Sequence, residues 1–71
     1  MPCRTPVQSS VLRWFEFDPV RSTLKVEFVA TGEVYRYRGV SPARVEGLLQ
    51  AESKGRYFNA HIRDRYPFDH L

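Results

Sequence analysis

The sequence predicts an α+β fold: a three-stranded antiparallel meander followed by two helices packed on one face, in the order β-β-β-α-α. Two observations lead to this prediction. Apolar and polar residues alternate in short runs between residues 11 and 38, which is typical of strands with one buried face. Between residues 42 and 63 the apolar residues instead recur every three or four positions, which is typical of helices that pack on a sheet.

Three strands are expected, at Val11–Phe17, Leu24–Val29 and Glu33–Arg38. Leu24–Val29 has the clearest alternation of apolar and charged residues, so one face of this strand is expected to be buried. Asp18–Pro19 is a turn signal that ends the first strand. Thr31–Gly32 predicts a tight hairpin between the second and third strands.

The third strand carries alternating aromatic and basic residues. Tyr35 and Tyr37 share one face, whereas Arg36 and Arg38 share the other face with Val34. The tyrosines and the arginines therefore cannot all face the same ligand. We expect the tyrosines to belong to the core, with their hydroxyl groups reaching its edge.

The first strand is apolar on both faces. Trp14 has the parity of Leu12, opposite Phe15 and Phe17. Either this strand contains a β-bulge or one of its sides meets a partner protein. An exposed Trp14 would be a typical interface hot spot, whereas a buried one would be a core residue covered by the C-terminal segment.

The first helix is expected to start at Ser41–Pro42, since serine can cap a helix and proline fits its first position. Val45, Leu48 and Leu49 form an apolar stripe that must pack on the sheet. Lys54–Gly55 is expected to end this helix, with the glycine in a left-handed conformation.

A second helix is expected over Arg56–Arg63. Phe58 and Ile62, four residues apart, would face the core, and the cations at the two ends would share a polar stripe with Asn59. Pro67 disfavours helical backbone in the residue before it, so the helix is expected to end before that point.

Length and composition indicate one small globular domain. We expect residues 1–8, with two prolines, to be a flexible arm, and residues 9–71 to form the domain. Cys3 is the one cysteine, so it cannot form an internal disulfide and is expected to be a free thiol. Charges interrupt every hydrophobic stretch, so we expect no membrane segment and a cytoplasmic location.

Three segments together resemble the KTSC family, the short domain found at the C-terminus of some lysyl-tRNA synthetases and as a stand-alone bacterial or phage protein. The first consists of Ser9–Ser10 with Leu12 and the strand end Phe17–Asp18, and the second is Gly32–Val40. The third is Ser53–Asn59, continuing to Ile62–Arg63 and Tyr66–Pro67. The resemblance implies no catalytic residue and no established activity. RNA binding is an expectation that follows from the attachment of the family's domain to a synthetase.

The leading hypothesis is a non-catalytic domain that binds RNA through a basic C-terminal segment. The net charge is +3, and nine of the eleven basic residues are arginine, whose guanidinium suits phosphate and stacks on bases. Tyr57 or Trp14 would stack a base. The candidate nucleic-acid-binding residues are Arg36, Arg38, Lys54, Arg56, Tyr57, Asn59, Arg63 and Arg65.

The alternative hypothesis is a protein-interaction module, either an adaptor or a phage-encoded inhibitor, with Trp14 at its interface. We expect no enzyme activity, no cofactor and no metal. His61 with Asp64 matches no standard zinc spacing, and the sequence contains no nucleophile elbow and no phosphate-binding glycine loop.

Overall fold

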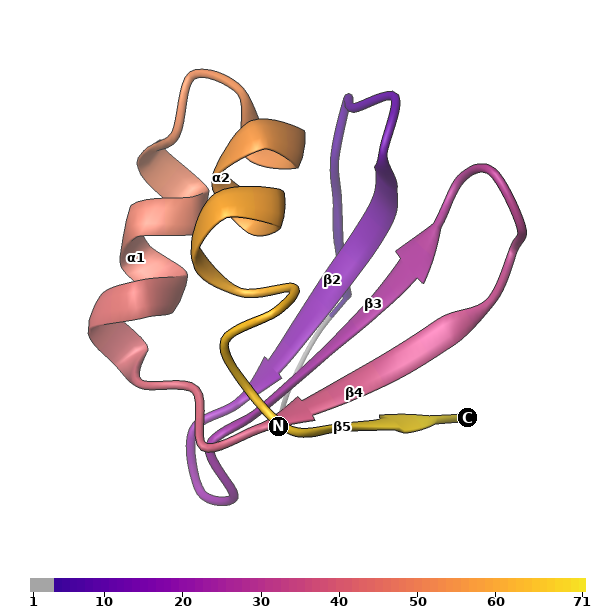
Figure 1. Cartoon of the computed structure of the whole chain (residues 1–71). Coiled ribbons are helices and arrows are strands. Elements are labelled where there is room, and N and C mark those ends of the chain that lie inside the picture. The colour runs from indigo at the N-terminus through magenta and orange to yellow at the C-terminus, as the bar shows by residue number, and fades with distance from the viewer. Residues whose placement is uncertain (1–3) are drawn as a thin grey trace.

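The computed structural model describes residues 4–71, so Cys3 and its expected free thiol lie outside the described residues. The chain forms a five-stranded antiparallel sheet with the strand order β1-β2-β3-β4-β5, and two helices cover one face of it (Figure 1). The elements are β1 (Arg4–Pro6), β2 (Leu12–Asp18), β3 (Thr23–Phe28), β4 (Val34–Arg38), α1 (Pro42–Gln50), α2 (Lys54–His61) and β5 (Phe68–His70).

The α+β class is confirmed, but the prediction of three strands is wrong, because the sheet has five. The three predicted strands are β2, β3 and β4, in the expected meander. β1 lies within the segment that we expected to be a flexible arm, and β5 follows the second helix. Each added strand has three residues, which is too short for an alternating pattern, and each pairs along one edge of the meander.

A β-bulge in β2 explains its two apolar faces. Leu12 is paired with Phe28 and Trp14 with Glu27, so the register shifts between Leu12 and Trp14. The extra residue turns both Leu12 and Phe15 toward the helices, while Trp14 lies on the opposite face of the sheet. Of the two alternatives that the sequence left open for this strand, the bulge is therefore the one present.

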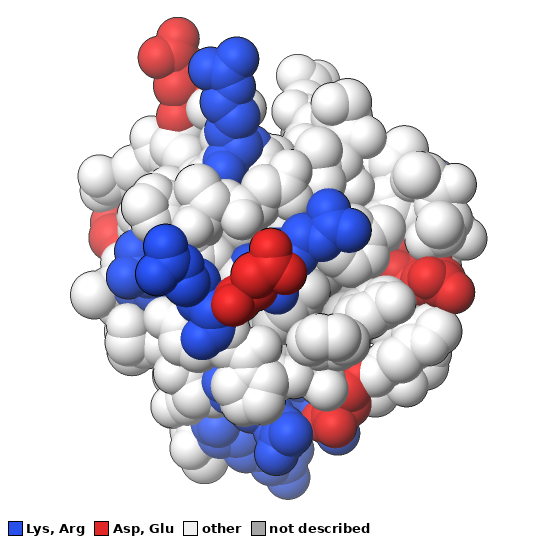
Figure 2. Space-filling model, in the orientation of Figure 1, with Lys and Arg blue, Asp and Glu red and all other residues white. Residues whose placement is uncertain are grey.

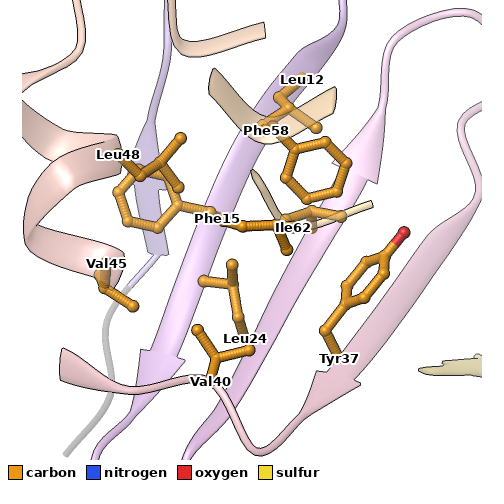
Figure 3. Close-up of a cluster of buried hydrophobic side chains, with 10 residues drawn as sticks. Leu12, Phe15, Leu24, Tyr37, Val40, Val45, Leu48, Phe58 and Ile62 are labelled. Atoms are coloured by element: carbon orange, nitrogen blue, oxygen red, sulfur yellow. The ribbon is translucent and has the colours of Figure 1, made fainter. Parts of the chain in front are cut away.

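The core is one cluster between the sheet and the helices (Figure 3). Its buried members come from three strands, both helices and the residues that follow β4 and α2: Leu12, Phe15, Leu24, Val26, Tyr37, Val40, Val45, Leu48, Phe58 and Ile62. The expectation that Tyr35 and Tyr37 face the core is confirmed, with Tyr35 partly buried against the cluster. Leu49, which we expected in the buried stripe, is 44% exposed.

The helix boundaries confirm one prediction and correct another. Ser41 caps α1, its side chain accepting a hydrogen bond from the Arg44 amide at 3.3 Å, and Pro42 occupies the first turn. The predicted helix end at Lys54–Gly55 is wrong. α1 ends at Gln50, and Ser53 caps α2, so that the lysine and the glycine lie in the first turn of the second helix.

Gly55 is buried because α2 packs closely against the segment that precedes β2. A Cβ atom at this position would lie 2.8 Å from Val11 Cγ2 and 3.0 Å from Ser9 Oγ. Ser9 Oγ itself accepts a hydrogen bond from the Val11 amide at 3.0 Å, which fixes the contacted segment. The glycine is therefore required for close packing and not for a left-handed backbone.

Gly55→Ala is expected to lower the free energy of unfolding by about 1–3 kcal/mol, because the added methyl overpacks this contact. Helix propensity alone predicts the opposite sign, since alanine is the better helix former. Urea unfolding followed by circular dichroism measures the change. Ala60→Gly, at an exposed position of the same helix, is the control and should cost at most about 1 kcal/mol. A higher urea midpoint for Gly55→Ala would contradict the packing argument.

Tyr37 is 2% exposed, and burial raises the pKa of its phenol from 10.0 to about 12, against an opposing effect of Arg63. The unfolded chain ionises near pH 10 while the folded chain keeps the proton. The difference in pKa contributes about 2–3 kcal/mol to the free energy of unfolding. This contribution is fully present below pH 10 and is lost as the pH rises to 12.

We therefore expect the free energy of unfolding to fall more steeply between pH 10 and 12 in the wild type than in Tyr37→Phe, which has no phenol to titrate at this position. Urea titrations at half-unit pH steps provide the comparison, and the variant also corrects for the other tyrosines and the lysines. Parallel curves for the two proteins would show that Tyr37 ionises normally.

Candidate nucleic-acid interface

The face of the sheet opposite the helices, here called the outer face, carries a row of charges that crosses all five strands. Consecutive members of the row are register partners: Arg4, Glu16, Lys25, Arg36 and Asp69. Glu16 Oε1 lies 3.9 Å from Arg4 Nε, and Glu16 Oε2 lies 3.5 Å from Lys25 Nζ. Cross-strand pairs of opposite charge stabilise a sheet modestly, and each carboxylate offsets part of the charge of the cations that share it.

Arg36 and Arg38, two of the candidate nucleic-acid-binding residues, lie on this outer face. Both contact the same carboxylate oxygen, Asp69 Oδ2, at 3.3 Å and 3.4 Å. They are thus separated by the sheet and the core from the candidate residues on the helices. The structure does not bring the two groups together.

Trp14 is also on the outer face, where it is only 8% exposed. Its indole N–H donates to Glu27 Oε1 at 2.9 Å, and the Arg4 guanidinium lies 4.2 Å above its ring centre. The indole is therefore covered by β1 and not by the C-terminal segment that we expected. Neither an exposed hot spot nor a free surface for base stacking is present at this residue.

The helical layer, residues 41–67, carries five Lys and Arg against three Asp and Glu. Within residues 4–71, none of these five cations has an acidic oxygen within 4.0 Å, whereas all six Lys and Arg of the sheet and its turns have one. We call the unpaired group the helix-side cations: Arg44, Lys54, Arg56, Arg63 and Arg65.

The Lys and Arg side chains in view in Figure 2 do not form one continuous patch. On the side of the molecule shown in Figure 2, acidic side chains and uncharged surface separate the groups of Lys and Arg. A ligand that lies along the helical layer is on the opposite side of the sheet from Arg36 and Arg38.

A polar groove of about 590 Å³ runs between the start of α2 and the segment that follows β1. Lys54, Arg56 and Asn59 line it from the helix, and Gln8 and Ser9 line it from the opposite segment. Lys54 Nζ also donates to the Ala51 carbonyl at 3.2 Å, which holds its ammonium at the junction of the two helices.

Further along α2, the Asn59 side chain is hydrogen-bonded to a neighbouring cation, Arg63. Its Oδ1 accepts a long hydrogen bond of 3.4 Å from Arg63 Nη1. The same guanidinium lies 5.4 Å from the centre of the Phe28 ring. Arg63 is thus held over the sheet by one helix residue and one strand residue, while its charge stays exposed to solvent.

Tyr57, a candidate base-stacking residue, joins the two helices. Its hydroxyl donates to the Arg44 carbonyl at 3.2 Å, and its ring packs beside His61 and over Gly47, where a Cβ atom would collide with the hydroxyl. The sequence analysis did not include Arg44 among the candidate residues, because no pattern in the sequence shows that the first helix lies beside Tyr57 of the second. The Tyr66 hydroxyl, and then that of Tyr57, raise the pKa of Arg44 further above its ordinary value.

Residues 4–71 contain no cluster of three His, Cys, Asp or Glu side chains that could hold a metal ion. Over the same residues, no helix has the length and hydrophobicity needed to cross a membrane. The arrangement can supply cations, amides and hydroxyls to a bound anion.

Comparison with known proteins identifies the family. A family model described as the KTSC domain matches residues 8–66. An uncharacterized protein of Stutzerimonas stutzeri is 48% identical over 63 residues, which cover 89% of this chain and 87% of that protein. A crystal structure of a KTSC domain protein from Yersinia pestis superposes with a TM-score of 0.93 at 30% identity, covering 100% of this chain and 99% of the other.

A lysine–tRNA ligase of Nostoc punctiforme is 38% identical over 64 residues. The match covers 90% of this chain but 11% of the ligase, so the domain is a small part of that protein. The fold, the family model and these relatives agree, and the chain belongs to the KTSC domain family.

Proposed function

We propose that this domain binds RNA, single-stranded or structured, through its helical layer, and that it does so without catalysis. One observation carries the proposal. The helix-side cations have no acidic partner among residues 4–71, whereas the cations of the sheet are all paired. An unpaired guanidinium can contact phosphate without first giving up an ion pair.

The geometry supports a path for an RNA backbone along α2. Lys54 and Arg56 border the polar groove at the start of the helix, and Arg63 and Arg65 follow the end of it. Asn59 lies between these two groups and adds an amide donor. Contacts of this kind set the position of a strand and depend little on its sequence.

The relatives add support of a different kind. Two of them are lysine–tRNA ligases, from Nostoc punctiforme and another Nostoc strain, and their name states that they act on an RNA. In both ligases the match covers 11% of the length. A domain joined to an enzyme that handles tRNA could bind that substrate, and we extend this role to the present chain.

The test is fluorescence anisotropy with labelled RNA 12-mers at several salt concentrations. Contacts by Lys54, Arg56, Arg63 and Arg65 predict an affinity that falls roughly 50-fold between 50 and 200 mM salt, since each single-strand phosphate contact contributes about −0.7 to the logarithmic slope. Arg56→Gln with Arg63→Gln should weaken binding at low salt and make the slope shallower by about two contacts.

The control is Arg36→Gln with Arg38→Gln, which removes the same charge from the outer face. This variant should keep most of the wild-type affinity and the full salt slope. Absence of binding by the wild type at 20 mM salt would refute the function. An equal loss in the two double variants would show that net charge, and not the helical layer, attracts the RNA.

A further inference from the structure

A pocket of about 380 Å³ opens between the residues after α2 and the β3–β4 hairpin. This volume lies in the range of small-molecule sites. The pocket lies toward the other end of α2 from the polar groove described above, and the two share Ser10 and Val11 in their walls. Arg63 stands at its edge and is thus shared between the pocket and the path proposed for the RNA backbone.

Aromatic rings form the wall of this aromatic pocket. Phe28 and Tyr35 meet edge to face, with ring centres 5.3 Å apart, and Phe68 lies 5.2 Å from Tyr35 and 5.6 Å from Tyr37. Phe68 is 51% exposed although it is large and apolar. A planar ring that entered the pocket would cover this exposed surface and stack on it.

The hydroxyl of Tyr37 supplies a polar group at the inner end. The residue is almost fully buried, and Figure 3 shows its hydroxyl directed away from Leu24 and Val40. Among residues 4–71 this hydroxyl has no hydrogen-bond partner. Every fully buried side-chain oxygen or nitrogen in this part of the chain does have a partner, so the hydroxyl of Tyr37 is not fully buried. The hydroxyl is therefore reached from the pocket that the residue lines.

A tyrosine hydroxyl is protonated at neutral pH, and burial raises the pKa of Tyr37 further, to about 12. It can therefore donate a hydrogen bond to a ring nitrogen or a carbonyl oxygen of a ligand. A ligand that fills the pocket displaces water from this hydroxyl, so a ligand that offers a hydrogen-bond acceptor there is favoured over an apolar ligand of the same size.

Two carboxylates at the border set the complementary preference. Glu33 and Asp64 line the pocket together with Arg63. Ionised carboxylates only accept hydrogen bonds, so they favour a ring that carries an amino group and repel a phosphate placed inside. The guanidinium, 5.4 Å from the Phe28 ring, can instead hold a phosphate outside the mouth.

We propose that the aromatic pocket binds one unstacked nucleobase that carries an exocyclic amino group. This inference rests on the proposed function, which supplies the RNA strand whose backbone passes Arg63. The base stacks on Phe68, beside the Tyr35 ring, which His70 already covers by stacking at 4.7 Å between ring centres. It accepts a hydrogen bond from Tyr37 and donates its amino hydrogens to Asp64 or Glu33.

Cytosine and uracil provide the sharpest test, because they are pyrimidines of equal size. Cytosine has an amino group at C4 and an acceptor at N3, whereas uracil has a carbonyl group at C4 and a donor at N3. Anisotropy with C12 and U12 RNA is expected to show a five- to tenfold preference for C12 in the wild type, the size of one or two net hydrogen bonds. Tyr37→Phe keeps the ring and should weaken C12 binding several-fold. Phe68→Ala, at a half-exposed position, should weaken both RNAs about tenfold through lost stacking.

The nucleosides cytidine and uridine separate the pocket from the phosphate contacts. Cytidine should shift the NMR signals of the Tyr35 and Phe68 rings, and uridine should shift them less. Salt-dependent RNA binding with equal affinity for C12 and U12, unchanged in Tyr37→Phe, would overturn the pocket and leave the proposed function intact. Cytidine shifts without RNA binding would support the pocket and refute the function. Thermal unfolding confirms that both variants fold.

Discussion

Two helices of nine and eight residues depend on the apolar cluster that lies between them and the sheet. Helices this short are not stable alone in water, so α1 and α2 persist because Val45, Leu48, Phe58 and Ile62 are buried against the strands. The same contacts position α2 and the residues after it, which carry the cations that we assign to RNA binding. Phe58 and Ile62 fix the rotation of α2, and that rotation sets which of its cations face solvent.

The separation of paired and unpaired cations follows from the two-layer architecture. On the outer face, the strand register places Glu16 opposite Lys25 and Asp69 opposite Arg36, close enough for their side chains to form ion pairs. The helices have no such partner element on their exposed side. Their excess of positive charge is therefore left to solvent, while the outer face is close to neutral and its one large aromatic group, Trp14, is covered.

Much of the fold could be predicted from the sequence where a side-chain pattern reflects a local rule. Alternation located β3, Ser41–Pro42 located the start of α1, and the parity of Tyr37 placed it in the core. The edge strands could not be found, because backbone pairing holds them and three residues carry no period. Gly55 was misread, since a sequence does not show whether a glycine serves a turn or a close contact.

The candidate site was predicted in part for a similar reason. The basic segment after Ser53 was visible in the sequence, and its cations lie in α2 or in the residues that follow it. The aromatic pocket was not visible, because it joins Phe28, Tyr35 and Phe68 from three strands with Arg63 from a turn. Which basic residues are neutralised was also hidden, since Asp69 reaches Arg36 and Arg38 only through the pairing of β5.

The two short strands at the edges of the sheet make this domain well suited to fusion. β1 and β5 lie at opposite edges of the sheet, so the first and last strands of the described chain are each paired on one side only. The core can therefore be the same in a protein made almost wholly of this domain and in one where it is a minor part. The relatives from Stutzerimonas and Nostoc are examples of these two arrangements.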